Sequence, residues 1–365
     1  MHDLSIEDFR WGLEHEFPLI KEGRVFSDFS NTTFADLDSI IQHLPSYPAD
    51  YASLRIGDQG IKVKRWYMEG FERFDETGRF LYTVPKGMEI RTPISTSLPE
   101  ALSTLRSDIA TWTATAAPFG YTAANVSFNP IQAEEFIPNP PENEWEKRER
   151  AGTAEYLHML TYGPDINFSH PNLTTEQLIA IGKKLTFYSP YLVPFTFSSP
   201  FYKGELWGGL SRRTFYRTGR RPAVAVFLPE GTPITTSTPA LTRIARIPSE
   251  IGRIEFKAFD MVADISLYEP LGNLLLGILL DTSLLGTLIV PNQAEHQKSA
   301  RYGFADGGIY EQSKKVLAAA KSALPSELQS TLYPLEEMLE SGQTPAHQMI
   351  KVYNKNKSIL AAISN

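Results

Sequence analysis

The sequence predicts an α+β fold, because segments with two different hydrophobic periods interleave along the chain. Apolar and polar residues alternate with period two in short stretches, as in half-buried strands, and helical patterns lie between them. No glycine-rich phosphate loop joins a strand to a helix. The expected strands span residues 11–17, 61–72, 87–92, 125–129, 165–169, 223–227 and 252–259. The expected helices span 33–43, 98–114, 142–160, 174–188 and 265–280, with two more near the C-terminus.

The composition is that of an ordinary globular protein. The chain has 365 residues, of which 42% are hydrophobic and 21% charged, enough to bury a large core. No internal repeat is visible, and no Pro- or Gly-rich stretch is long enough to act as a linker. We therefore expect one unit over 1–365, with a helical C-terminal region at 261–365.

Charge and cysteine content exclude several function classes. The formal net charge is −7 without a block of basic residues, so neither nucleic acid nor an anionic membrane is an expected partner. The chain has no cysteine, which excludes disulfides, cysteine nucleophiles and thiolate metal sites. Residues 1–10 carry acidic residues and no apolar core, so we expect no targeting segment and a cytoplasmic location.

One long apolar segment, at 271–290, approaches the length of a membrane span. Gly272, Asn273, Gly277 and Asp281 interrupt it, and no basic flank follows. The sequence therefore predicts a buried helix and turn there, with no membrane partner.

Two carboxylates share one face of the first expected strand. Period two places Glu14 and Glu16 of the Gly-Leu-Glu-His-Glu-Phe stretch side by side. Carboxylates held together repel each other unless a cation lies between them. A solvated strand face is the alternative, unless further carboxylates converge on the same place.

Two later strands carry a carboxylate and a cation on one face. Glu89 and Arg91 form one such pair, and Glu255 and Lys257 form the other. Three strands that offer Glu from one face would line a charged surface, and hard oxygen ligands suit Mg²⁺ or Mn²⁺. Arg91, Arg213 and Lys257 would then face phosphate or a substrate carboxylate. Each pair taken alone is also compatible with an ordinary row of opposite charges on an exposed strand face.

Several motifs occur in the order found in one enzyme family. The Gly-Leu-Glu-His-Glu-Phe motif at residues 12–17 resembles the first-strand motif of glutamate-cysteine ligases, in their plant and proteobacterial form. The segments at 89–93, 165–169 and 199–201, and Ser211-Arg212-Arg213-Thr214 followed by Arg217-Thr218-Gly219, are similar to later motifs of that family. Order and spacing agree over 11–260, so the chain resembles glutamate-cysteine ligases and their carboxylate-amine ligase relatives.

This resemblance implies an antiparallel sheet curved into a funnel, a glutamine synthetase-like catalytic fold with ATP and metals inside. It also implies an acyl-phosphate route to an amide, with the γ-carboxylate of glutamate as the acid and cysteine as the commonest amine. The implied metal ligands are Glu14, Glu16, Glu89 and Glu255, with Asn167 nearby. Arg213 and Arg91 would neutralise the acyl phosphate or bind the substrate carboxylate, assisted by Lys257. If the stretch is extended, the adjacent Arg212 and Arg213 side chains diverge and only one can point into the funnel, and the motif selects Arg213.

Three details remain open at the level of sequence. Position 257 is Lys where the family has Arg, and Asp165 stands where the carboxylate-amine ligase branch carries His, so the acid or the amine could differ. Arg148, on a basic helix before the Asn167 strand, is a candidate for binding phosphate, although such helices are usually salt-bridged surfaces. A non-catalytic relative that binds nucleotide or an amino acid is a further alternative. The oligomeric state is not predicted.

Overall fold

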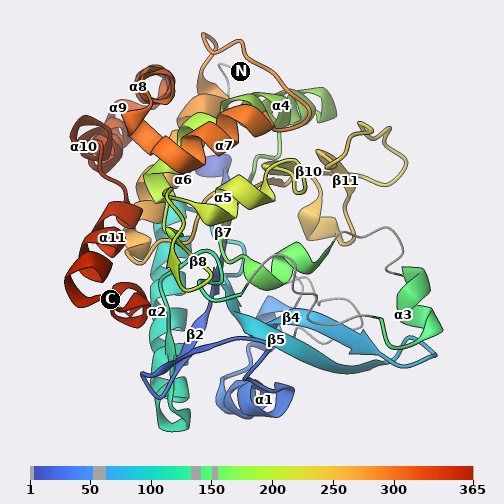
Figure 1. The fold of residues 1–365 in the computed structure, drawn as a ribbon. Helices are drawn as coiled ribbons and strands as arrows, with labels where there is room; N and C mark the ends of the chain where they lie inside the picture. Colours follow the sequence, from blue (N-terminus) through green and yellow to red (C-terminus); the bar gives the residue numbers. More distant parts are fainter. Residues whose placement is uncertain (1–3, 52–62, 133–140, 150–154, 365) are drawn as a thin grey trace.

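The protein is described here by a computed structural model that covers residues 4–51, 63–132, 141–149 and 155–364. The main sheet consists of β1 (Arg10–Phe17), β4 (Trp66–Phe74), β5 (Phe80–Arg91), β7 (Pro164–Ser169), β10 (Val224–Leu228), β11 (Thr242–Ile244) and β12 (Ile254–Phe256). Within the described residues, these seven strands lie in the order β11-β10-β12-β7-β1-β5-β4 (Figure 1). Every neighbouring pair is antiparallel except β10 and β11, which are parallel.

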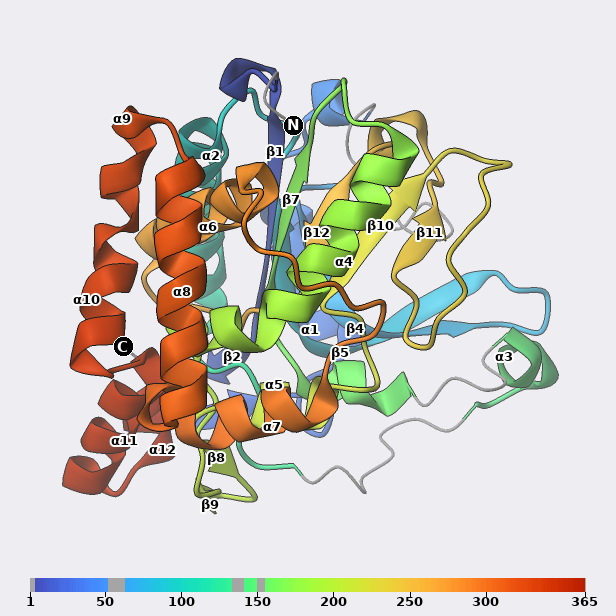
Figure 2. The same ribbon diagram turned by 90° about the horizontal axis from the view of Figure 1, so that it is seen from above.

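Among the described residues, α2 (Leu98–Ala116), α4 (Thr175–Leu192) and α6 (Tyr268–Leu280) lie on one side of this sheet. The helix α2 packs on β1, α4 packs on β10, and α6 lies between α2 and the C-terminal helices. In Figure 2 the β4–β5 hairpin runs crosswise to β1 and β7, which shows how strongly the sheet curls. The prediction of an α+β fold with a curved, mainly antiparallel sheet is confirmed. We call the opposite side of the sheet the inner face.

The helices occupy the following positions. The α-helices are α1 (Phe34–His43), α2 (Leu98–Ala116), α3 (Glu144–Glu149), α4 (Thr175–Leu192), α5 (Arg212–Arg217), α6 (Tyr268–Leu280), α7 (Gln293–Tyr302), α8 (Gly307–Ala323), α9 (Ser326–Gln329), α10 (Tyr333–Ser341), α11 (Pro345–Asn356) and α12 (Ile359–Ile363). Short 3₁₀ helices are η1 (Ile6–Asp8), η2 (Pro48–Asp50), η4 (Ala117–Phe119), η5 (Glu155–Leu160), η6 (Val193–Thr196), η7 (Pro248–Glu250), η8 (Ile265–Leu267), η9 (Gly303–Ala305) and η10 (Ser330–Leu332).

The first strand shows why one face is buried and the other is free. Along β1, Trp11, Leu13 and Phe17 are buried, whereas Glu14 and Glu16 are only half-buried. Because successive side chains of a strand point to opposite faces, the apolar set packs under the helices and the two carboxylates face inward.

His15 belongs to the buried set and not to the inner face, as the strand period predicts. Its Nδ1 lies 2.6 Å from the hydroxyl of Tyr268 on α6. Burial lowers the pKa of His15 to about 4, so the ring is neutral at neutral pH.

The apolar segment that begins at residue 271 forms most of α6. Eleven of the 13 residues of this helix are buried, against α2 on one side and α8 on the other. The prediction of a buried helix is therefore confirmed. Over the residues that the structure describes, no helix combines the length and the apolar character needed to cross a membrane.

Several expected elements differ from those observed. Residues 125–129 form no strand and contribute a single bridge, from Phe128 to Thr161. The expected helix 142–160 is instead α3 and η5, with 150–154 outside the described residues, as are residues 61 and 62 of the expected strand 61–72. The strand expected at 252–259 is limited to 254–256, and the region after α6 holds six described α-helices instead of two.

A second small core joins distant parts of the chain. A three-stranded sheet of β2 (Leu19–Lys21), β3 (Val25–Ser27) and β6 (Tyr121–Ala123) lies beside the main sheet, and β8 (Phe201–Tyr202) pairs with β9 (Glu205–Leu206). Ile20 and Phe26 pack with Ala362 and Ile363 of the last helix. The carbonyl of Ile363 also accepts a hydrogen bond from the amide of Asn125 at 2.7 Å.

Candidate active site

The central strands bring acidic side chains from distant parts of the chain to the inner face. Glu14 of β1 is paired with Arg91 of β5 on one side and with Asp165 of β7 on the other. Glu16, two residues further on, is paired with Glu89. The register therefore places these charged side chains in adjacent rows across the sheet.

The carboxylates form two separate groups. Within each group the ligand oxygens lie within 4.8 Å of one another. The Glu14 group is Glu14, Asp165 and Glu255, and the Glu16 group is Glu16, Glu69 and Glu89. The four glutamates expected from sequence are thus divided between the two groups, and each group gains one further carboxylate.

Two cations lie within the Glu14 group. The ammonium of Lys257 forms ion pairs with both Asp165 and Glu255. The guanidinium of Arg253 lies 3.0 Å from Glu255 and 3.6 Å from Glu14. All three carboxylates of the group are therefore in direct contact with a basic side chain.

These contacts leave two carboxyls of the group with pKa values shifted in opposite directions. Burial raises the pKa of Asp165 to about 7, with Lys257 opposing the shift. Burial acts in the same direction on Glu255, but the charges of Lys257 and Arg253 outweigh it and lower the pKa of Glu255 to about 2. The same carboxylates raise the pKa of Lys257 against the effect of its burial, which keeps the ammonium charged.

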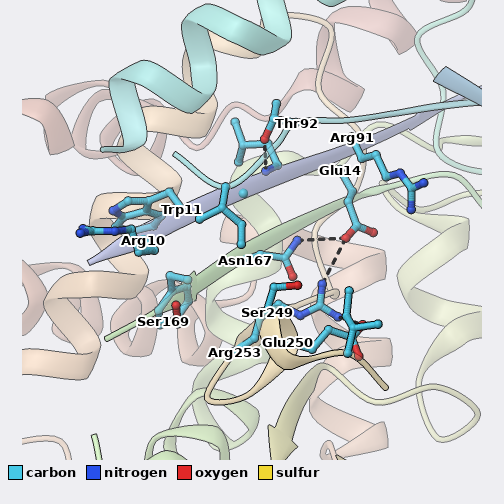
Figure 3. Close-up of a pocket in the computed structure, with 15 residues that line it drawn as sticks. Arg10, Trp11, Glu14, Arg91, Thr92, Asn167, Ser169, Ser249, Glu250 and Arg253 are labelled. Atoms are coloured by element: carbon cyan, nitrogen blue, oxygen red, sulfur yellow. Dashed lines mark hydrogen bonds and ion pairs between the residues drawn. The ribbon is translucent and has the colours of Figure 1, made fainter. Parts of the chain in front are cut away.

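A cavity of about 80 Å³ opens beside Glu14 at one end of the site (Figure 3). In this view Asn167 and Arg253 both point toward the Glu14 carboxylate, and Asn167 donates a hydrogen bond to it at 3.2 Å. Arg91 lines the same cavity, and its guanidinium lies 4.9 Å from the centre of the Tyr67 ring. The structure therefore brings Asn167 and Arg91 together with Glu14.

The Glu16 group has a different set of neighbours. Lys86 donates to Glu16 at 2.9 Å, and its second hydrogen bond goes to the carbonyl of Thr161 at 2.8 Å. The amide of Gly163 donates to the other Glu16 oxygen at 3.0 Å. Burial raises the pKa of Glu16, Lys86 opposes this shift, and the charge of Glu69 adds to it.

A second cavity, of about 130 Å³, lies on the Glu16 side of the site. Its lining is strongly charged. It includes Glu16, Lys86, Glu89, Asp165, Arg213, Arg217, Arg221 and Lys257. Basic side chains from β5 (Lys86), from α5 (Arg213 and Arg217) and from the chain after β12 (Lys257) therefore line one small cavity.

Arg213 enters this cavity from the first turn of α5. This stretch is helical, and Ser211 caps the helix by accepting a hydrogen bond from the amide of Thr214 at 2.9 Å. The Arg213 guanidinium is buried and donates to the carbonyls of Ala258 at 3.1 Å and Lys257 at 3.2 Å. These bonds fix its position at the wall of the cavity.

Arg212 points away from the cavity. Its guanidinium lies 4.3 Å from the ring centre of Tyr202 and 5.5 Å from that of Trp207. Consecutive residues of a helix point about 100° apart, so a helical α5 separates Arg212 from Arg213 as an extended chain would. Of the two arginines, Arg213 is the one that lines this cavity.

Arg217 is the most unusual member of the cavity. It is 8% exposed, and within the described part of the chain its guanidinium has no hydrogen-bond or ion-pair partner. Burial and the nearby charge of Arg213 lower its pKa well below the ordinary value. A buried cation without such a partner is costly, and the charges of Asp165 and Glu16 in the same cavity offset the lowered pKa only in part.

Arg148 is not brought to the site. It is exposed on α3, which packs on β4 near the tip of the β4–β5 hairpin. It lines neither of the two cavities formed by the described residues. Its neighbour Glu146 instead forms a buried ion pair with Arg73 of β4 at 2.9 Å.

Five residues of the site were not selected from sequence. They are Glu69, Lys86, Asp165, Arg217 and Arg253. Asp165, Arg217 and Arg253 lie within the motifs, and the period-two pattern could have placed Asp165 with Asn167 and Arg253 with Glu255. Glu69 and Lys86 carry no such signal, because their positions depend on the pairing of β4 with β5.

No protein-family model matches the chain, and no curated protein matches its sequence. Solved structures do match. A glutamate-cysteine ligase from Francisella tularensis, solved in complex with AMP, has a TM-score of 0.56 at 10% identity, covering 97% of this chain and 87% of its own. The chain has the fold of a glutamate-cysteine ligase.

Two further structures share this fold. A bifunctional glutathione synthetase from Pasteurella multocida has a TM-score of 0.52 at 12% identity over 98% of this chain, which spans 52% of that protein's length. The ligase PafA, solved in complex with the prokaryotic ubiquitin-like protein Pup, has a TM-score of 0.51 at 13% identity, covering 99% of this chain and 72% of its own. The predicted glutamine synthetase-like fold is thereby confirmed, whereas identities this low establish the fold alone.

Proposed function

We propose that this protein is an ATP- and divalent metal-dependent ligase that joins a carboxylate to an amine through an acyl phosphate. The observation that carries the proposal is the pairing of carboxylates suited to a metal with a buried, unpartnered arginine in one small cavity. The fold shared with two ligases supports the same assignment.

The carboxylate oxygens of the Glu16 group are of the kind that Mg²⁺ or Mn²⁺ prefers. A metal bound there would neutralise phosphate charge and orient the transferring group. The chain's own residues supply the rest of the positioning. Arg213 and Lys257 lie at the wall of the cavity, where they can stabilise negative charge on the acyl phosphate.

In the reaction, an oxygen of the substrate carboxylate attacks the γ-phosphorus of ATP, the bond from that phosphorus to the β,γ-bridging oxygen breaks, and ADP leaves. The amine nitrogen then attacks the acyl carbon, the carbon–oxygen bond to phosphate breaks, and the amine loses a proton. Carboxylate and ATP both carry negative charge, so bringing them together requires the cations that line the cavity.

Arg217 supports an acid substrate with a second anionic group. One carboxylate must reach the phosphoryl group, and Arg217 lies nine-tenths buried without a partner for its own charge among the described residues. A dicarboxylate such as glutamate satisfies both requirements, with the γ-carboxylate as the reacting group. Cysteine is the first amine to test. Asn167, Arg91 and Arg253, at the other cavity, are placed to contact the nucleotide.

The decisive experiment combines the purified protein with ATP, Mg²⁺ and a matrix of amino-acid pairs. We expect an amide product by mass spectrometry with one ADP and one phosphate for each bond formed. AMP and pyrophosphate in stoichiometry with the amide would contradict the acyl-phosphate route. Binding of nucleotide without any product would favour the non-catalytic alternative, and product from other pairs would identify a specialised ligase.

A further inference from the structure

The Glu14 group and the Glu16 group differ in where their cations lie. In the Glu16 group, Lys86 contacts Glu16 from one edge and directs its other bond to a backbone carbonyl. In the Glu14 group, the ammonium of Lys257 bridges Asp165 and Glu255. Bridging two carboxylates is the position that a divalent ion would take.

The position of Lys257 is fixed at its backbone as well as at its side chain. Its amide donates to the carbonyl of Ala223 at 2.8 Å, and its carbonyl accepts a hydrogen bond from Arg213 at 3.2 Å. Its side chain is 22% exposed. Withdrawing the ammonium into solvent would leave two carboxylates without this partner, a large penalty at a partly buried site.

Arg253 closes the same group from the other side. It contacts Glu255 at 3.0 Å and Glu14 at 3.6 Å, and a third contact, to Glu250 at 3.2 Å, anchors it to η7. A divalent ion among these carboxylates would lie close to two cations, and such repulsion is strong where solvent screening is weak.

We infer that Lys257 takes the place of a divalent metal in the Glu14 group, so that, of the two carboxylate groups of the described residues, the Glu16 group is the one that holds a divalent ion. An ammonium suits this role because it is a compact point charge with three donors, whereas a guanidinium is wide and planar.

The test measures Mn²⁺ binding by equilibrium dialysis in the absence of nucleotide. Compared with the unmodified chain, Lys257→Met should bind one more Mn²⁺ per chain, and adding Glu255→Gln to it should remove that ion. Glu255→Gln alone should leave the count unchanged. Lys321→Met is the matched control, because it removes an ammonium from an ion pair with Glu336 (2.7 Å) between α8 and α10.

Two results would overturn the inference. One is a folded Lys257→Met protein with no additional ion, and the other is loss of an ion on Glu255→Gln alone. The second measurement needs no change at Lys257, so it decides the question even where Lys257→Met does not fold. The inference rests on the proposed function only for the identity of the metal. The number of Mn²⁺ ions bound per chain is measured without any reaction taking place. A negative ligase assay and a negative Mn²⁺ result are therefore distinguishable.

Discussion

The guanidinium of Arg213 lies directly against the backbone of Gly163, the residue whose amide binds Glu16. A Cβ at position 163 would lie 2.5 Å from Cζ of Arg213. Gly163→Ala should therefore displace Arg213 and lower kcat/KM by about tenfold or more, since small misplacements of a catalytic group are expensive. The control is Gly307→Ala, where a Cβ meets open space. Equal kcat/KM values for the two variants would show that the position of Arg213 does not matter for catalysis.

Replacement of the two adjacent arginines should have different effects. Arg213→Lys should lose about 2 to 4 kcal/mol of transition-state stabilisation, because Lys cannot reproduce two directed hydrogen bonds. Arg212→Lys should leave kcat/KM nearly unchanged and lower Tm, since it loses stacking on Tyr202. Kinetics and thermal unfolding of both proteins check this, and a larger catalytic defect at Arg212 would reverse the assignment.

Arg217 should reduce stability in the absence of substrate. Arg217→Met removes a buried guanidinium without a partner in the described structure and should stabilise the free protein by about 1 to 4 kcal/mol. L-Glutamate should raise the Tm of the unmodified protein but not that of Arg217→Met. Differential scanning calorimetry with and without glutamate measures both effects. A variant that is less stable and still stabilised by glutamate would show a purely structural role for Arg217.

The two carboxylate groups should respond differently to loss of charge. Glu16→Gln and Glu89→Gln should lower turnover at least about a hundredfold and weaken Mn²⁺ binding, because each removes charge from the metal. Glu14→Gln should leave the Mn²⁺ affinity unchanged, and Glu205→Gln, at an exposed position on β9, is the control. Normal turnover in both Glu16 and Glu89 variants would place the metal elsewhere.

Stability should fall in mild acid because two histidines are buried as neutral rings. Burial lowers the pKa of His296 to about 4, as it does that of His15. Between pH 6.5 and 4 the unfolded chain binds a proton at each of these positions and the native state does not, so stability rises with pH over this range. Lowering the pH from neutral to 4 should therefore cost about 3 kcal/mol of stability for each histidine. Urea unfolding at several pH values should show a shallower pH dependence for His296→Gln, and an unchanged slope would contradict the burial effect.

Much of the fold was predictable because hydrophobic period is a local property. The alternation along β1 identified which side chains face inward, and it correctly separated His15 from Glu14 and Glu16. The same reasoning failed at 125–129, where Ser127 and Asn129 are buried in hydrogen bonds and no neighbouring strand pairs over this segment.

The division of the site into two groups was not predictable, since it depends on register between strands far apart in sequence. Glu69 reaches the Glu16 group only because β4 pairs with β5. Nothing in the alternation of a single strand shows that Lys257 would bond across to Asp165 of β7. Such contacts follow from tertiary structure and carry no local sequence signal.

The contact between the last helix and the small second core bears on how the chain folds during synthesis. Ile20 and Phe26 are made long before Ala362 and Ile363, yet the four residues share one buried cluster. Contacts so distant in sequence form late, after the intervening chain has been ordered. This core cannot close until residue 363 has left the ribosome, and until then its early strands present bare apolar surface of the kind that chaperones bind.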